Sequence, residues 1–156
     1  PENMGIFADL TVQENLLLAA RGARNAAAMD SQRLRWIFGM FPAVEKFWHH
    51  PAGKLSGGQK QMVAVARAIV EPRDLLIVDE PSKGLAPAII NNMIAAFDQL
   101  KQSGVTILLV EQNLNFARRL GDSVAVMDNG RVVHAGAMAA LAQDEALQRS
   151  LLGLAL

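Results

Sequence analysis

Two apolar runs separated by a helix-length stretch restrict the fold of this chain more than any other feature. Residues 75–78 and 105–110 are almost continuously apolar, as is typical of strands buried on both faces of a sheet. Residues 87–102 begin at a proline and are followed by Gly104, a pattern that predicts a helix. A strand, a crossover helix and a second strand make a βαβ unit with parallel strands. The sequence therefore predicts an α/β fold.

The residues before this unit read as a small helical region. Thr11 and Glu14 have the spacing of a capping box, in which each side chain satisfies a backbone donor at a helix start. Glycines and a proline then divide the segment into short pieces, so no sustained heptad is present. We expect helices at residues 12–20, 32–38, 44–48 and 60–70. Residues 1–70 are accordingly assigned to a helical subdomain and residues 71–156 to a sheet-containing core.

The residue pattern in the last part of the chain predicts a hairpin between two helices. Asn129 and Gly130 suit a type I′ turn and lie between the segments 123–127 and 131–134. Helices are expected at residues 114–120 and 144–151.

Composition excludes several classes of protein. Fifteen basic side chains match 15 acidic ones, a balance that argues against a broad electrostatic footprint on nucleic acid. Because the chain has no cysteine, disulfides, thiolate nucleophiles and cysteine-ligated metal centres are excluded. No apolar run reaches the roughly 18 to 20 residues that span a bilayer. We therefore expect no nucleic-acid partner and no membrane-spanning segment.

Residues 56–59 form the first candidate site. Ser56 can cap the helix that follows, and Gly57 and Gly58 leave the backbone amides open to close approach. A helix N-terminus combines a partial positive charge with free N–H groups and so favours a phosphate. A Ser-Gly-Gly turn is a weak signal by itself, and an ordinary helix cap is the simpler explanation.

Two carboxylates at the end of the first apolar run form the second candidate site. In open α/β sheets, ligands bind at the carboxyl edge of the strands, where Asp79 and Glu80 lie. Asp79 is placed to face a hydrated Mg²⁺, and Glu80, next along the pleat, to face an attacking water. The alternative is that both carboxylates only cap the next turn.

Together these motifs resemble the nucleotide-binding domain of ABC transporters. Residues 55–59 match the family's LSGGQ signature letter for letter, and residues 75–80 match its Walker B strand with the catalytic glutamate. The segment similar to the D-loop includes Ser82, Gly84 and Leu85. Ala86 stands where many members have aspartate, which affects only the D-loop's polar contact across a dimer. The resemblance implies a partial P-loop NTPase fold: half of a parallel-sheet core, a helical signature subdomain and a C-terminal hairpin.

The resemblance also implies a role for each matched residue. The γ-phosphate of an ATP bound by the other subunit of a head-to-tail dimer would be contacted by Ser56, Gly57, Gly58 and Gln59. Asp79 would hold Mg²⁺ through water, and Glu80 would be the general base that polarises the hydrolytic water. ATP and Mg²⁺ are therefore the expected cofactors.

Gln112 follows the second apolar run, where the family usually places a switch histidine. A glutamine amide can hydrogen-bond a γ-phosphate or a water, but it carries no positive charge, so a role as proton relay is lost. Gln112 is a catalytic candidate together with Glu80. The alternative is a polar residue at a helix start.

A combination of segments resembles the ATPase subunits of branched-chain amino-acid importers. It consists of residues 10–16, 80–87 and 110–113, with Glu2 about where other members carry the Q-loop glutamine. The implied partners are a second ATP-binding subunit, transmembrane permease subunits and, indirectly, a periplasmic binding protein. The implied location is cytoplasmic, on the inner face of the cell membrane. For Glu2, the alternative is a cut end without such a role.

One motif of the family does not occur in the sequence. The Walker A loop, Gly-x-x-x-x-Gly-Lys-Ser/Thr, is absent, and this loop supplies the lysine and the backbone nest that cradle the phosphates. The 156 residues begin at Pro1 rather than Met, which we take as a cut end. We expect an ABC-type ATPase in the complete protein and a fragment that neither binds nor hydrolyses ATP alone.

Two other functions compete with this interpretation. A chromosome-maintenance or DNA-repair ATPase also carries a signature and a Walker B strand. Those proteins insert a long coiled coil before the signature, where this chain has short, interrupted segments. The third possibility is a non-catalytic interaction fragment. A Walker A loop upstream in the same reading frame would exclude it.

Overall fold

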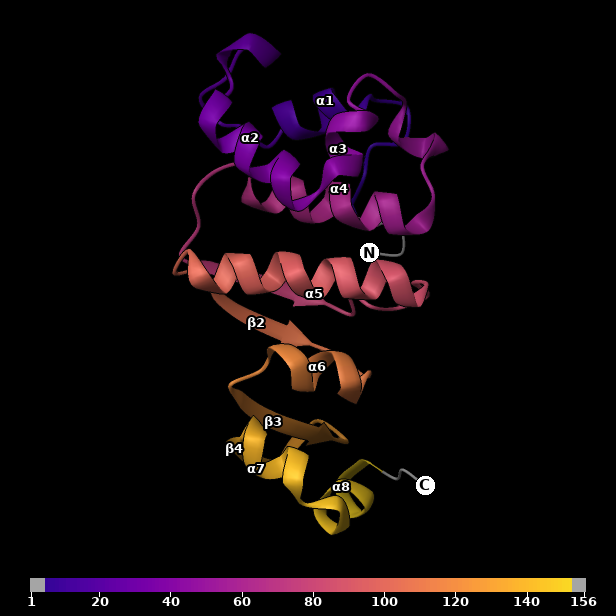
Figure 1. The fold of residues 1–156 in the computed structure, drawn as a ribbon, viewed down its shortest axis with the longest axis vertical. Coiled ribbons are helices and arrows are strands. Elements are labelled where there is room, and N and C mark those ends of the chain that lie inside the picture. The colour runs from indigo at the N-terminus through magenta and orange to yellow at the C-terminus, as the bar shows by residue number, and fades with distance from the viewer. Residues whose placement is uncertain (1–4, 153–156) are drawn as a thin grey trace. The chain divides into compact units, whose positions relative to one another are not determined.

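Residues 5–152, except the side chain of Leu152, are described by a computed structural model in which the chain divides into two units between Val110 and Glu111. Unit 1 contains the helical region and the βαβ unit, and unit 2 contains the hairpin and its helices (Figure 1). Glu2 lies outside the described residues, so its Q-loop position stays a prediction.

Short helices make up the first part of unit 1. They are α1 (Val12–Leu17), η1 (Ala26–Ala28), α2 (Ser31–Met40), α3 (Pro42–Lys46), η2 (Ala52–Lys54) and α4 (Gly57–Ile69). Between residue 5 and α4 the longest helix is α2, with 10 residues. The described part of this region therefore has the interrupted helices that the sequence predicted and no long coiled coil.

The start of α1 agrees with the sequence, but its end does not. The Thr11 side chain accepts a hydrogen bond from the Glu14 N–H, and the Glu14 carboxylate accepts one from the Thr11 N–H at 2.8 Å, which confirms the capping box. The predicted helix reached Ala20, whereas α1 ends at Leu17. The Ala19 N–H bonds to the Leu16 carbonyl three residues back, and the Ala20 N–H is shared between the Leu16 and Leu17 carbonyls, so the last turn tightens instead of continuing as a regular α-helix.

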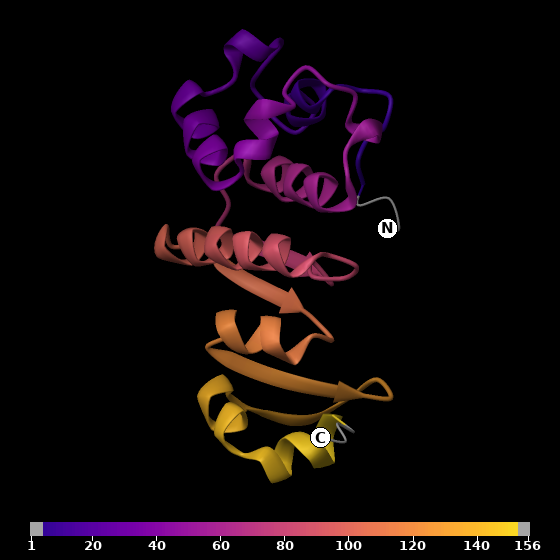
Figure 2. The same ribbon diagram turned by 45° about the vertical axis from the view of Figure 1, so that its right-hand side comes forward.

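The βαβ unit follows α4 as the sequence predicted. It consists of β1 (Leu75–Asp79), α5 (Pro87–Gln102) and β2 (Thr106–Val110), and the strands pair in parallel from Leu75 with Thr106 to Asp79 with Val110. Both views show α5 between the helical region and the strands (Figures 1 and 2). The apolar side chains that α5 buries are Met93, Ile94, Ala96, Phe97 and Leu100.

The sequence predicted that the β1–β2 strands are buried on both faces, and this prediction is wrong for the face opposite α5. Leu75 is 52% exposed, Ile77 63%, Leu108 54% and Val110 51%. The register places these four residues on one face, because Ile77 pairs with Leu108 and Asp79 with Val110. We call this surface the bare face. The prediction failed because apolar composition cannot say whether a second layer is present, and the described residues supply only α5.

Unit 2 is built around a hairpin. Its elements are α6 (Leu114–Leu120), β3 (Ser123–Asp128), β4 (Arg131–Ala137), α7 (Met138–Gln143) and α8 (Glu145–Leu152). Asn129 has φ 46° and Gly130 φ 75°, both positive as a type I′ turn requires, so the predicted turn is confirmed. The core of the unit consists of Phe116, Leu120, Met138 and Leu141.

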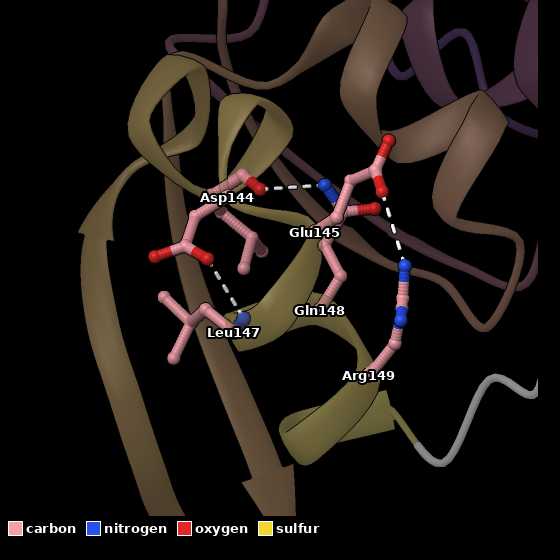
Figure 3. Close-up of polar contacts among 6 residues, drawn as sticks. Asp144, Glu145, Leu147, Gln148 and Arg149 are labelled. Carbon is pink, nitrogen blue, oxygen red and sulfur yellow. Dashed lines mark hydrogen bonds and ion pairs between the residues drawn. The ribbon is translucent and has the colours of Figure 1, made fainter.

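Helix α7 was missed in the sequence, whereas α8 was predicted. The Asp144 Oδ1 accepts a hydrogen bond from the Leu147 N–H at 2.9 Å, and Arg149 pairs with Glu145 at 3.2 Å (Figure 3). Asp144 is therefore the cap of α8 rather than its first residue. No side chain caps α7, which is the physical reason why its start gave no signal.

Among residues 5–152, no helix has both the length and the apolar character needed to cross a membrane.

Candidate functional site

Residues 56–59, which we call the α4 start, are ordered by a reciprocal cap. The Ser56 Oγ accepts a hydrogen bond from the Gln59 N–H at 3.4 Å, and the Gln59 Oε1 accepts one from the Ser56 N–H at 2.9 Å. The Lys60 N–H bonds to the Ser56 carbonyl at 2.9 Å. The predicted cap at Ser56 is confirmed, although the helix begins at Gly57 rather than at residue 60.

The two glycines of the α4 start have different surroundings. A Cβ on Gly57 would meet nothing within 4 Å, whereas a Cβ on Gly58 would lie 2.9 Å from the Ile89 Cγ2 on α5. Their N–H groups are the first two of the helix and have no intrahelical acceptor. Gly57 thus leaves an exposed backbone donor, and Gly58 lets α4 approach α5 closely. This geometry suits an anion that contacts the helix end from outside.

The two candidate carboxylates lie at the carboxyl end of β1. Asp79 is the last residue of the strand and is exposed. Glu80 has φ 44°, so it leaves the strand in a left-handed conformation that costs a non-glycine residue about 1–3 kcal/mol. The Glu80 N–H still bonds to the Val110 carbonyl at 2.8 Å. Because Glu80 is not a pleated strand residue, strand alternation does not determine where its side chain points.

Lys83 pairs with the Glu80 carboxylate. The Lys83 Nζ lies 2.6 Å from the Glu80 Oε2, and the side chains are 77% and 24% exposed. This hydrogen bond, and next the negative charge of Glu80, raise the pKa of the Lys83 ammonium. A cation therefore contacts the carboxylate that the sequence proposes as general base, an interaction that the sequence analysis did not anticipate.

The segment after Glu80 is a pair of turns. The Lys83 N–H bonds to the Glu80 carbonyl at 3.2 Å, and the Leu85 N–H bonds to the Ser82 carbonyl at 3.2 Å. Ser82 is buried at 6% exposure, and Gly84 has φ 70°, which favours glycine. The D-loop candidates therefore belong to one ordered turn that begins at Glu80.

Gln112 lies in unit 2, in the turn before α6. Asn113 caps α6 by accepting a hydrogen bond from the Phe116 N–H at 3.2 Å, and its own N–H donates to the Glu111 Oε2 at 3.0 Å. Asn113 thus supplies the side-chain cap of α6, and the role of Gln112, just before it, stays a prediction. Gln112 is exposed.

Metal binding at this site would rest on few protein ligands. Residues 5–152 contain no group of three or more His, Asp or Glu side chains that could hold a metal ion. Mg²⁺ commonly keeps several waters and uses one or two carboxylates together with substrate phosphates. The exposed Asp79 fits that limited role.

Two residues that fix the first described segment of unit 1 were not singled out in the sequence. Asn15 is fully buried, and its side chain donates to the Phe7 and Thr11 carbonyls at 2.9 Å and accepts from the Phe7 N–H at 3.0 Å. Its signal was a polar residue on the apolar stripe between Val12 and Leu16. Arg67 on α4 donates to the Gly5 carbonyl, a long-range contact for which the sequence offers no signal.

A family comparison agrees with this geometry. Residues 1–83 match the family model described as "ABC transporter". The chain therefore belongs to the ABC transporter family, and the fold is part of an ATP-binding cassette.

The most similar relatives reported are ATP-binding proteins of amino-acid transport. The chain is 40% identical over 154 residues to the "High-affinity branched-chain amino acid transport ATP-binding protein BraG" of Pseudomonas aeruginosa, and this match covers 98% of the chain and 65% of the relative. It is 35% identical to a "Probable branched-chain amino acid transport ATP-binding protein LivF" of Archaeoglobus fulgidus, covering 99% and 65%. The chain thus spans about 65% of the length of these curated relatives.

Solved structures show the same fold. An "ATP binding subunit of ABC transporter" is 29% identical with a TM-score of 0.75, and the match covers 98% of this chain and 63% of that one. A dimeric ATP-binding cassette in a post-hydrolysis state, bound to ADP and Pi, is 26% identical with a TM-score of 0.74, covering 88% and 61%.

Proposed function

We propose that this chain is part of the ATP-hydrolysing subunit of an ABC importer for branched-chain amino acids. The single observation that carries the proposal is the α4 start. A reciprocally capped helix presents an exposed Gly57 N–H, and it carries the signature sequence of the family to which the chain belongs. Under this proposal, residues 1–70 are the signature subdomain and residues 71–156 are the second part of the nucleotide-binding core.

The location of the α4 start supports a site shared between two subunits. A cavity of about 250 Å³ in unit 1 is lined by residues of the segment 20–30 between α1 and α2, by Arg33 on α2 and by residues 70–72 after α4, and none of residues 56–59 lines it. Ser56 and Gly57 are instead exposed. An exposed anion site gains affinity when a second surface covers it, because exclusion of water strengthens its hydrogen bonds. The proposed partner is a second ATP-binding subunit arranged head to tail.

The proposed roles follow from the chemistry of each side chain. The Gly57 and Gly58 N–H groups and the Ser56 hydroxyl donate to a phosphate, with Gln59 holding Ser56 in place. Glu80 accepts the proton of the hydrolytic water, and its carboxylate has acceptor sites besides the one that Lys83 occupies. Gln112 donates an amide hydrogen bond to a γ-phosphate or to a water. Ser82, Gly84 and Leu85 form the D-loop.

The cofactors proposed are ATP and Mg²⁺. When bound, Mg²⁺ supplies positive charge that offsets the charge developing on the phosphate oxygens. Asp79 is the residue that would hold it through water. Since no Walker A loop occurs in these 156 residues, the chain alone lacks the groups that cradle the phosphates, and we propose that it does not bind ATP by itself.

The remaining partners are proposed because the relatives are described as transport ATP-binding proteins, which in this family work with permease subunits. Permease subunits would place the protein on the cytoplasmic face of the membrane, with a periplasmic binding protein as an indirect partner. Branched-chain amino acids are the proposed cargo because the two most similar relatives reported carry that description.

The test uses a completed subunit, which we define as residues 1–156 joined at the N-terminus to a Walker A segment from an ABC ATP-binding subunit. We expect Mg²⁺-dependent ATP hydrolysis by the completed subunit. Titration of the 156-residue chain alone should show no saturable binding below about 1 mM. Micromolar ATP binding by the chain alone would overturn our account of the missing loop.

Two substitutions test the proposed residues. Glu80→Gln should lower turnover by about 10²–10⁴-fold while ATP binding persists, since the amide cannot accept the proton. Ser56→Arg should abolish turnover by placing bulk and charge at the phosphate contact. The matched controls are Glu45→Gln and Ser31→Arg, at exposed helix positions, which should leave turnover unchanged. Normal activity of either test variant contradicts the role assigned to that residue.

A second experiment tests the cargo. ATP hydrolysis by the completed subunit should rise when it is reconstituted with the permease of a branched-chain importer and its loaded binding protein. The permease of an arginine importer is the control, because the "Arginine transport ATP-binding protein ArtM" of Bacillus subtilis is only 32% identical to this chain. Stimulation by the arginine system alone would contradict the proposed cargo.

A further inference from the structure

Arg67, in the last turn of α4, binds the first described residues of the chain to that helix. Its Nη1 donates a hydrogen bond to the Gly5 carbonyl oxygen, and its guanidinium carbon lies 5.0 Å from the centroid of the Phe7 ring. A guanidinium over an aromatic face at this distance is a cation–π contact. Arg67 is half-buried, and Phe7 is 49% exposed, so the contact lies at the surface of unit 1.

Stability alone does not explain why this residue is an arginine. The Arg67 Nε is buried and has no hydrogen-bond partner among the described residues. Burial also lowers the pKa of the Arg67 guanidinium, which shows that the charged form loses solvation there. A buried donor without a partner is unfavourable, and this cost offsets the gain from one hydrogen bond and one cation–π contact. A methionine of similar length would fill the same space without that cost.

The same segment is also tied to the residues just before the α4 start. The Gly53 N–H bonds to the Ala8 carbonyl and the Ala52 N–H to the Leu10 carbonyl, both at 2.8 Å. A Cβ on Gly53 would lie 2.9 Å from the Ala8 oxygen, so this approach is close. Residues 5–10 therefore have two attachments. Backbone hydrogen bonds join them to residues 52 and 53, just before the α4 start, and Arg67 joins them to α4 itself.

We propose that Arg67 is a positioning residue that fixes the α4 start relative to residues 5–10, so that the phosphate contact of residues 56–59 follows the position of that segment. This inference rests on the proposed function, because it assumes that the α4 start contacts ATP. Arg67 does not itself touch the nucleotide under this scheme. It acts through the helix on which it lies.

The first test is Arg67→Met in the completed subunit. We expect KM for ATP to rise about tenfold while kcat stays within about twofold, because a displaced α4 start weakens binding without removing the general base. Arg67→Lys, which keeps the cation and one donor, should recover about half of that loss on a logarithmic scale. The control is Arg24→Met, an exposed arginine of the same unit, which should leave KM unchanged.

A second variant examines whether Arg67 and Phe7 act as one contact. Phe7→Leu should raise KM in the same direction, and the double variant should raise it no further than Arg67→Met alone, since coupled residues are not additive. If Arg67→Met does not fold, Phe7→Leu and Arg67→Lys carry the test by themselves.

The melting temperature of the variants separates positioning from ordinary stabilisation. A purely structural role predicts that kcat and Tm fall together in Arg67→Met, and that result overturns the inference, as does an unchanged KM. We expect Tm to stay within about 2–3 °C of the wild type. Absence of ATPase activity in the wild-type completed subunit overturns the proposed function itself, and this inference with it.

Discussion

Two regions of unit 1 differ in how well the described residues meet their needs. Polar side chains of the helical region such as Asn15 find hydrogen-bond partners, whereas the apolar side chains of the β1–β2 sheet are buried on one face only. In the helical region, the fully buried Asn15 finds its hydrogen-bond partners within the same unit, and the α4 start is capped by its own Gln59. In the sheet, α5 covers one face while Ile77 on the bare face is 63% exposed. Polar groups can thus find hydrogen-bond partners within a short segment. An apolar strand is buried only when another layer of the protein packs on each side of the sheet.

The largest expected effect is the difference in stability loss between substitutions on the two sides of the β1–β2 sheet. Phe97→Ala on α5, the helix that covers the sheet, should destabilise the chain by about 3–5 kcal/mol, because it empties a fully buried position. Ile77→Ala on the bare face should change stability by less than about 0.5 kcal/mol. Urea unfolding of the 156-residue chain measures both. A loss above about 1.5 kcal/mol for Ile77→Ala would show that the bare face is covered in solution.

The next effect compares two helix starts. Ser56→Ala removes the side-chain cap of α4 and should cost about 1 kcal/mol. Helix α5 has Ala86 at its N-cap and no side-chain cap, so Ala86→Asp should stabilise the chain by about 0.5–1 kcal/mol. Changes of opposite sign in thermal unfolding would support the contrast, and equal losses would contradict it.

The smallest effect concerns the α1 cap and depends on pH. Hydrogen bonds from the Thr11 N–H and then from its hydroxyl lower the pKa of the Glu14 carboxyl below its ordinary value of 4.5. A lowered pKa in the folded state means that the stabilisation is present above the unfolded pKa and is lost as the pH falls through the folded one. The Tm should therefore fall between about pH 7 and about pH 3, and Glu14→Gln should make this fall smaller. An unchanged difference would show that the cap does not contribute.

Local signals allowed much of this fold to be predicted from sequence. Helix α5 has the predicted bounds because Pro87 and Gly104 bracket it, and the Asn129-Gly130 turn is encoded in two residues. The bare face could not be foreseen, because its exposure depends on a layer that apolar composition does not reveal. For the candidate site, the cap at Ser56 was foreseen, again from a short pattern.

Other parts of the site were beyond a sequence pattern for different reasons. The left-handed backbone of Glu80 is a conformation that glycine favours, and nothing in a run of apolar residues followed by two carboxylates indicates it. The pairing of Lys83 with Glu80 depends on that turn. Arg67 and Gly5 are distant in sequence and meet only through the packing of the helical region.

The close approach of Gly58 to Ile89 makes the choice of residue at one position depend on the residue at the other. Two positions on an open surface would accept substitutions independently of each other. A methyl group on Gly58 would lie 2.9 Å from the Ile89 Cγ2, so a larger residue at position 58 requires the Ile89 side chain or its helix to shift. We therefore expect a change at Gly58 to be tolerated best together with a smaller residue at position 89. Gly58→Ala combined with Ile89→Ala is the exchange that this geometry permits, and Gly57, with open space around it, carries no such partner.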